Sequence, residues 1–391
     1  MHASRREFLV HGLKVSALLP ALPLLSRSSP RSPGERVLVV VQLSGGNDAL
    51  NMVVPHRQDA YFRLRPTLAL KRANLHALDD EHGLHPELRG LSELFAEGCL
   101  TVVHGVGYPH PDRSHFRSLE IWHTAEPESP PRTGWLGRLA DQVALEHAGS
   151  LAALHIGDEE LPLALLGRSY FAPSFRDEHS LELRSFAGLA GAREELLAGG
   201  DDGGDLGFLR AAAESAYRAS ERMARAAEGR SPVEYPDLEL ARKLRLIARL
   251  VTGGFDTRLF LVSQGGYDTH ARQAATQAAL LGELSSSLTA FERDLQAAGL
   301  GERVGTLVFS EFGRRVAENA SRGTDHGAAA PLLLLGGNWR GGLRGTPPDL
   351  EHLVEDDVAF TTDFRSVYSA LERDWMGLVP CSSLPALDLS G

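Results

Sequence analysis

The chain has 391 residues, of which 43% are hydrophobic and 23% are charged, a composition typical of globular proteins. Its 40 basic and 51 acidic side chains give a formal net charge of −11 at pH 7, and there is no basic stripe, so nucleic acid is not an expected partner. The two cysteines, Cys99 and Cys381, exclude a disulfide framework and a cysteine-based zinc site.

The first 33 residues have the features of an export signal and its linker. The stretch S-R-R-E-F-L-V at 4–10 is similar to the twin-arginine consensus, a short apolar run follows at 13–25, and 26–34 is rich in Ser, Pro and Arg. The apolar run is too short for a stable transmembrane anchor. We therefore expect the twin-arginine translocase to export the folded chain to the periplasm or out of the cell. A cytosolic amphipathic leader is the alternative.

Residues 34–391 are expected to form one α/β domain, because strand patterns alternate with helix patterns. The continuous apolar run at 36–43 favours a strand buried on both faces, as in a parallel sheet. Further strands are predicted at 99–104, 151–156, 257–262, 304–309 and 331–335. Helices are predicted at 86–96, 116–122, 135–145, 238–250, 274–298 and 364–375. The fold class is a mostly parallel, doubly wound sheet flanked by helices, with a mostly helical insertion at about 174–250.

Acids and histidines follow several of these strands or lie beside them. They are Asp48, Asp268 with His270, Glu311, and Asp325 with His326. Because the loops after parallel strands meet at one edge of the sheet, these side chains are expected to lie close together. Carboxylates and neutral imidazoles are ligands for divalent metals, and two ions would clamp the attacking and leaving oxygens of a phosphoryl or sulfuryl transfer.

Each of these residues also has a purely structural interpretation. Asp48 would form an Asx-turn, the segment 267–270 would cap the next helix, and Asp325 with His326 would make an ordinary turn. Glu311 would pair with Arg314 or Arg315. Ser114, at the start of the helix predicted after 105–116, is either a capping residue or a nucleophile favoured by the helix dipole.

Taken together, the motifs of the chain resemble those of the bacterial "domain of unknown function 1501" family. They are the twin-arginine leader, Q-L-S-G-G-N-D-A-L-N, P-D-R-S-H-F-R-S, T-G-W-L-G-R, G-G-Y-D-T-H, S-E-F-G-R-R, T-D-H-G and T-T-D-F-R-S-V-Y, in this order. The resemblance runs from about Val37 to Trp375. That family is placed with the alkaline phosphatase and sulfatase superfamily, and its activity is unassigned, so the resemblance implies an alkaline phosphatase-like core.

The resemblance also implies roles for particular residues. Asp48 looks like the superfamily acid that binds one metal after the first strand, with Asp325 and His326 beside it. Asp268 and His270 look like ligands of the other metal, although a single residue separates them where the superfamily usually has three. Ser114 stands where the superfamily places its nucleophile.

Two further departures concern the late metal histidine and the sulfatase nucleophile. The late metal histidine of the phosphatases has no clear match, and T-T-D offers Asp363 instead. The absence of C-x-P-x-R around Cys99 argues against a formylglycine sulfatase.

The expected function is hydrolysis of a phosphate or sulfate ester that depends on one or two divalent ions (Zn, Mn, Mg or Ca). The expected substrate is an anionic small molecule or a glycan ester. Ser114 and His115 are the catalytic candidates, and Arg113, Arg117 or Arg314 would steady the anion. The substrate-binding candidates are Asn47, Asn51, Arg113, Glu311 and Arg314. The alternatives are a non-catalytic metal- or ligand-binding protein and a scaffold of an envelope complex.

Overall fold

The computed structural model describes residues 36–128, 132–146, 151–170, 172–176, 225, 228–337 and 339–389. The predicted signal at 1–33 and most of the predicted insertion lie outside the described residues. Among the residues that are described, no helix is both long enough and apolar enough to cross a membrane.

A nine-stranded sheet forms the centre of the molecule, with the order β13-β5-β12-β9-β1-β8-β6-β7 and with β14 paired to β5. The strands are β1 (Val37–Leu43), β5 (Leu100–Gly107), β6 (Ala153–Ile156), β7 (Ser174–Phe175), β8 (Leu259–Gln264), β9 (Val304–Ser310), β12 (Ala330–Gly336), β13 (Gly342–Arg344) and β14 (Thr362–Asp363). Only β12 runs against its neighbours β5 and β9 among these described strands. The expected mostly parallel sheet is therefore confirmed.

Strand β1 explains why the chain needs helices on both faces of the sheet. All seven of its residues are buried, and it pairs in parallel with both β8 and β9. Alternate side chains of a strand point to opposite faces. Val39 and Val41 pack into one apolar core, whereas Leu38 and Val40 pack into another.

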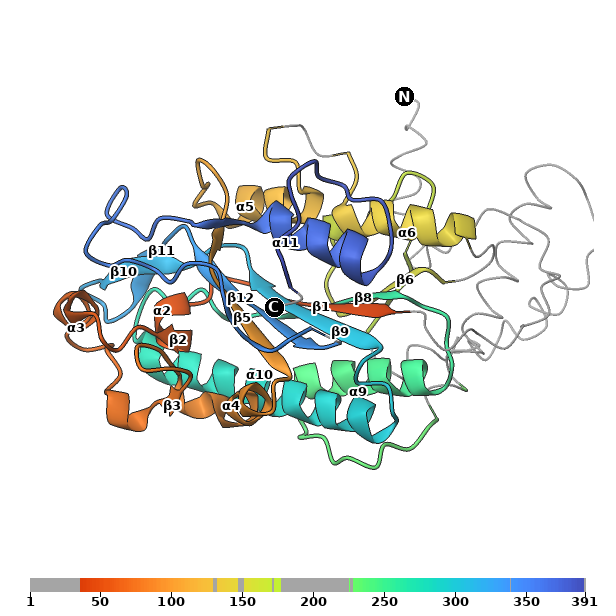
Figure 1. Ribbon diagram of the computed structural model, residues 1–391, viewed down its shortest axis with the longest axis horizontal. Coiled ribbons are helices and arrows are strands. Elements are labelled where there is room, and N and C mark those ends of the chain that lie inside the picture. The colour runs from red at the N-terminus through yellow and green to blue at the C-terminus, as the bar shows by residue number, and fades with distance from the viewer. Residues whose placement is uncertain are drawn as a thin grey trace, which may run out of the picture.

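Two helical layers supply the rest of these cores (Figure 1). On one face lie α5 (His115–Thr124), α6 (Trp135–Glu146) and α11 (Phe364–Ala370), which continues as the π-helical turn η5 (Leu371–Trp375). On the other lie α4 (Arg89–Ala96), α9 (Glu239–Thr252) and α10 (Gln273–Ala297). The sheet is thus covered on both faces, as the doubly wound prediction requires.

Smaller elements gather at the left-hand end of Figure 1, beyond the carboxyl ends of the parallel strands. They are α2 (Ala49–Met52), α3 (Asp59–Leu64) and a three-stranded sheet of β2 (Val53–Val54), β4 (Gly83–Leu84) and β3 (His76–Ala77). The hairpin of β10 (Arg314–Glu318) and β11 (Thr324–His326) lies there as well, and it pairs Arg314 with His326. The short 3₁₀ turns are η1 (Arg72–Asn74), η2 (Pro86–Leu88) and η3 (Leu163–Leu165).

Candidate metal centre

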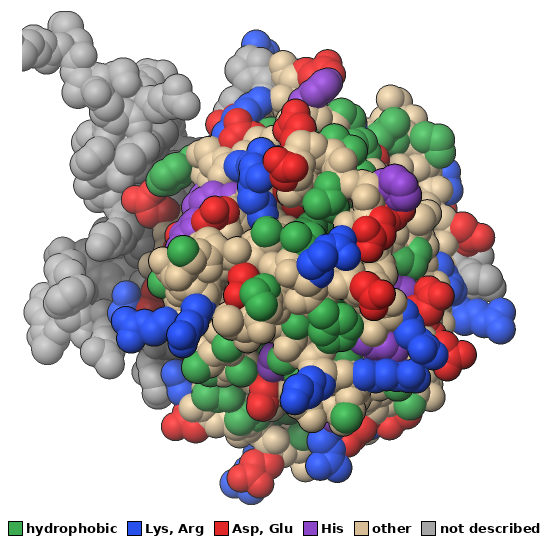
Figure 2. All heavy atoms as spheres, turned by 90° about the vertical axis from the view of Figure 1, so that its left-hand side faces the viewer, with side chains coloured by type: hydrophobic (Ala, Val, Ile, Leu, Met, Phe, Trp, Pro, Cys, Tyr) green, Lys and Arg blue, Asp and Glu red, His purple; other side chains and the backbone are tan. Residues whose placement is uncertain are grey.

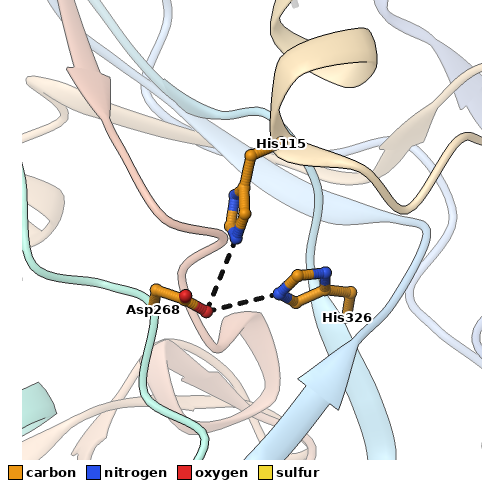
Figure 3. Close-up of side chains that lie close together, drawn as sticks. All are labelled: His115, Asp268 and His326. Carbon is orange, nitrogen blue, oxygen red and sulfur yellow. Dashed lines mark hydrogen bonds and ion pairs between the residues drawn. The ribbon is translucent and has the colours of Figure 1, made fainter.

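Three side chains from distant parts of the chain point toward one another at this end of the sheet (Figure 3). His115 is the first residue of α5, Asp268 lies in the loop after β8, and His326 ends β11. One ligand atom from each lies within 4.8 Å of the other two, so the three are close enough to hold a metal ion.

The oxygen Oδ1 of Asp268 is the point on which the imidazoles converge. The Nε2 atoms of His115 and His326 lie 3.5 and 3.3 Å from it. His270 joins them, because its Nε2 lies 2.9 Å from the same oxygen and 2.9 Å from His326 Nε2. The centre therefore contains three imidazoles and one carboxylate.

The opposite nitrogen of each ring faces an oxygen. His115 Nδ1 lies 2.8 Å from Glu311 Oε1, His326 Nδ1 lies 2.7 Å from the carbonyl oxygen of Arg113, and His270 Nδ1 lies 3.5 Å from Asp325 Oδ1. A carbonyl or carboxylate oxygen can only accept, so a ring that donates to it through Nδ1 has its lone pair on Nε2, the tautomer in which Nε2 could bind a metal ion.

These lone pairs make the four groups a good fit for a cation. In that tautomer three Nε2 lone pairs and one carboxylate oxygen would face one another, and a cation among them would relieve their mutual repulsion. Within the described residues, His115 Nε2 is buried and has no hydrogen-bond partner. Metal-bound histidines characteristically donate their other ring N–H to a carboxylate or a backbone carbonyl, and the same pattern holds here.

The electrostatics keep this site negatively charged at Asp268. Burial acts to raise the pKa of Asp268, but the hydrogen bond from Arg314 Nη2 at 2.7 Å and the nearby histidines outweigh it and lower that pKa to about 2. The hydrogen bond with Glu311 raises the pKa of His115. Hydrogen bonding from Asn319 lowers the pKa of Asp325, which lies 3.1 Å from the Asn319 amide. Asp268 is thus ionised and available as a ligand across the physiological pH range.

The glycine-rich loop after β1 contributes backbone rather than side chains. Gly45 has φ +119°, which favours glycine, and a Cβ at this position would clash with the backbone nitrogen of Asp268. The Gly45 N–H donates to Glu311 Oε1 at 2.8 Å, and its carbonyl accepts from Arg314 Nη2 at 2.5 Å. The loop therefore fixes the two side chains that hold His115 and Asp268.

The structure does not bring Asp48 into this cluster. Its Oδ2 accepts from Arg65 Nη1 at 2.6 Å and also from Gln273 Nε2, and the side chains of Asp48 and Arg65 are both fully buried. Asn51 joins the same buried network, since its Oδ1 accepts from Arg65 and Tyr61.

Asn47 is also buried outside the cluster, with its N–H donating to Ser310 Oγ. The three residues Asn47, Asp48 and Asn51 therefore share a buried setting, and their predicted roles in metal or substrate binding remain predictions.

The two residues of the predicted pair Asp325–His326 have different neighbours in the centre. His326 lies 3.3 Å from Asp268 Oδ1, whereas Asp325 lies 3.5 Å from Nδ1 of His270. Gly323, just before this pair, packs so closely that a Cβ there would clash with the backbone of His270. Asp325 therefore lies behind a histidine of the centre, as Glu311 does.

Ser114 is exposed at the N-cap of α5, directly before His115. In the described part of α5, no backbone N–H donates to its hydroxyl, so the capping hydrogen bond considered as the structural alternative is not formed. The Arg113 guanidinium lies 3.7 Å from both Glu355 and Asp357. Ser114 and Arg113 thus flank the centre without entering it.

Arg314 is buried rather than open to a substrate. Besides Asp268, it donates to the carbonyls of Gly46 at 2.7 Å and Thr324 at 2.8 Å. Sequence reasoning missed the apolar wall that Phe312 forms, with its ring 4.9 Å from that of His115 and 4.7 Å from that of His326. Phe312 stands within S-E-F-G-R-R, but an apolar residue in a loop carries no chemical signal by itself.

Comparison with known families gives one match over most of the chain. The family described as "Protein of unknown function (DUF1501)" matches residues 101–370. This range includes the motifs with His115, Asp268, His270 and His326, but not the glycine-rich loop after β1. No curated protein matches the chain.

Several solved structures match the chain at low sequence identity. The C-terminal periplasmic domain of EcEptC from Escherichia coli, in a complex with Zn, is 11% identical over 78% of this chain and 74% of that one, with a TM-score of 0.37. A protein in the alkaline phosphatase superfamily from Vibrio parahaemolyticus is 14% identical over 80% and 63%, with a TM-score of 0.36. Murine ectonucleotide pyrophosphatase/phosphodiesterase 5 in complex with AMP is 9% identical over 90% and 97%, with a TM-score of 0.40.

Proposed function

The chain belongs to the DUF1501 family of proteins of unknown function, and from its candidate metal centre we propose that it is an exported, metal-dependent hydrolase of phosphate or sulfate esters. The observation that carries this proposal is the convergence of three imidazole Nε2 atoms on one carboxylate oxygen. The centre is open to solvent, since the side chains of His270 and Asp268 are 45% and 50% exposed.

Four side chains would hold the ion: His115, His270 and His326 through Nε2, and Asp268 through a carboxylate oxygen. Three imidazole nitrogens and one oxygen favour zinc over calcium, magnesium and manganese, which prefer oxygen ligands. Glu311, Asp325 and the Arg113 carbonyl would each accept the N–H of one ring and so keep its Nε2 free for the ion.

The chemistry follows from what surrounds this centre. A divalent ion held there would supply positive charge to stabilise the charge that develops on the ester oxygens. Ser114 is the nucleophile, because its exposed hydroxyl lies at the positive end of α5, where the helix dipole favours an alkoxide. Arg113 binds the anion, since its loose 3.7 Å contacts leave the guanidinium available, whereas Arg314 is already fully bonded.

Metal content and ester hydrolysis, measured on the same preparation, test this function. We expect about one ion per chain, its loss in His326→Ala, and its retention in His352→Ala, an exposed histidine that pairs with Asp349. Aryl phosphates, phosphodiesters and aryl sulfates then serve as substrates, with Ser114→Ala expected to abolish turnover while keeping the ion. Full metal content in His326→Ala would show that this centre does not hold the ion.

A non-catalytic metal-binding protein is the second candidate function, and one observation favours it. The buried ion pair of Asp48 with Arg65 leaves a single group of potential ligands in the described part of the chain, not the two that a two-ion phosphoryl-transfer site needs. One ion per chain without hydrolysis of any of the three ester classes would decide for this candidate.

Export by the twin-arginine pathway is proposed from residues 4–10 of the sequence. Replacing both Arg5 and Arg6 by lysine is expected to retain the protein in the cytosol, as measured by cell fractionation. Unchanged export of this double variant would contradict the proposed route.

A further inference from the structure

We propose that the ester taken by this centre has an apolar alcohol part, an alkyl or aryl group that packs on Phe116. The centre would then prefer amphiphilic anionic esters over small hydrophilic ones. The inference rests on the proposed function, because it concerns the substrate class of the same site.

Phe116 is 90% exposed, more than any other large hydrophobic side chain in the described residues. Exposed apolar side chains are common on protein surfaces, so exposure alone is not informative. Its location is informative, because Phe116 directly follows His115, whose ring belongs to the metal centre. A phenyl ring left in water there gains free energy when an apolar group covers it.

The geometry of α5 places Phe116 beside the centre. Successive residues of a helix are about 100° apart, so Phe116 leaves α5 directly beside His115 but in a different direction from it. The inner face of α5 is formed by Ser118, Ile121 and Trp122, which are buried. Phe116 therefore lies outside the core and projects into solvent one residue after His115, as the exposed Ser114 lies one residue before it.

A second exposed apolar residue is held near Arg113. Val354 is 60% exposed and precedes Glu355, whose carboxylate lies 3.7 Å from the Arg113 guanidinium. Glu355 and Asp356 both have positive φ, at 53° and 60°, in a tight turn closed by hydrogen bonds of 2.9 and 3.0 Å between Val354 and Asp357. Such backbone costs free energy and is enriched at functional sites. The turn fixes Val354 in its exposed position.

Basic and exposed apolar side chains therefore both occur in the segments around the centre, namely Arg113, Phe116 and Val354. Figure 2 views the end of the molecule at which β10 and β11 lie, and it shows hydrophobic, basic and acidic side chains interspersed. Arg113 would attract the anion, while Phe116 and Val354 would cover an apolar group attached to it. A phenyl ring can also stack on a sugar, but Val354 offers no such face, so an alkyl or aryl group fits the pair better.

The test measures binding of phosphonates, which have no ester to hydrolyse. Affinities of ethylphosphonate, octylphosphonate and a glucose phosphonate for the metal-loaded protein are determined by calorimetry. We expect octylphosphonate to bind about tenfold more tightly than ethylphosphonate, as partial burial of its extra methylenes predicts. Phe116→Ser should reduce this ratio to about threefold or less without changing the ethylphosphonate affinity, and Phe116→Leu should largely preserve it.

Leu145 provides the matched control, because it is 85% exposed and lies on α6. Leu145→Ser should leave the ratio unchanged. Equal affinities for the two alkyl phosphonates, or no binding of either, would overturn the proposal. The proposal would also be overturned if the glucose phosphonate bound more tightly than the alkyl phosphonates and Phe116→Leu abolished this binding, because that result indicates a sugar substrate. Sedimentation with phosphatidylcholine vesicles, in the absence of an octyl preference, would instead assign Phe116 and Val354 to contact with a lipid surface.

Metal content and hydrolysis of a small aryl phosphate are measured on the same samples. A protein that lacks metal and hydrolyses no ester, but still prefers octylphosphonate through Phe116, refutes the proposed hydrolase alone. A protein that hydrolyses the small ester but shows no octyl preference refutes only the inference about its substrate.

Discussion

Replacing Asp48 by asparagine separates a structural ion pair from a metal ligand. The carboxylate and the Arg65 guanidinium are 2.6 Å apart, and neither side chain has any solvent exposure. Arg65 is further fixed by hydrogen bonds to the carbonyls of Val316 at 2.8 Å and Arg315 at 2.9 Å, so it cannot move out to water when its counter-charge is lost. Removing one partner of such a pair leaves an uncompensated buried charge, which costs about 3–5 kcal/mol.

We therefore expect Asp48→Asn to lower the free energy of unfolding by about 3–5 kcal/mol while the folded protein keeps its metal. Urea denaturation at pH 7 measures the first quantity and elemental analysis the second. Glu351→Gln is the matched control, because the Arg63–Glu351 pair lies at 3.2 Å with both side chains more than half exposed. The control should change the unfolding free energy by less than about 1 kcal/mol.

The opposite pattern would refute the reasoning. If Asp48→Asn unfolds with a free energy within about 1 kcal/mol of the wild type but loses its metal, the residue is a ligand, as the family resemblance implies. The carboxylate would then turn from Arg65 toward the ion in the metal-loaded protein.

Three further predictions follow from other parts of the structure. Glu311→Gln should weaken metal binding about 10–100-fold in competition with a chelator, because the carboxylate that fixes His115 is lost; unchanged affinity would show that Glu311 does not support the centre. Burial raises the pKa of Glu292 to about 8 from its ordinary value of 4.5, so between these pH values the folded state retains a proton that the unfolded state releases. Stability should therefore fall as pH rises through this range, by up to about 1.4 kcal/mol per pH unit, and Glu292→Gln should remove that dependence; parallel pH profiles of the two proteins would contradict this. Gly45→Ala should destabilise the protein by more than Gly254→Ala, since both glycines have positive φ but only Gly45 lies against the backbone of Asp268; equal losses in thermal denaturation would mean that backbone strain alone matters.

The local pattern of the sequence was sufficient to predict the layered fold. The run of buried residues in β1 has no polar face, so it predicts a strand covered on both sides, and the structure packs alternate residues of β1 into two separate cores. The period of the apolar residues likewise predicted α9. Periodicity does not determine strand direction, and the antiparallel placement of β12 between β5 and β9 was not foreseen.

The residue types of the site were also evident from the sequence, since Asp268, His270 and His326 stand at strand ends where loops converge. Which atoms meet there was decided only by the tertiary structure. Asp48 faces Arg65, a buried partner 17 residues away in the sequence. His115 reaches the centre because Ser118 of α5 donates a hydrogen bond to the carbonyl of Glu311. The direction of a side chain depends on such long-range contacts, and the spacing of residues along the chain does not encode them.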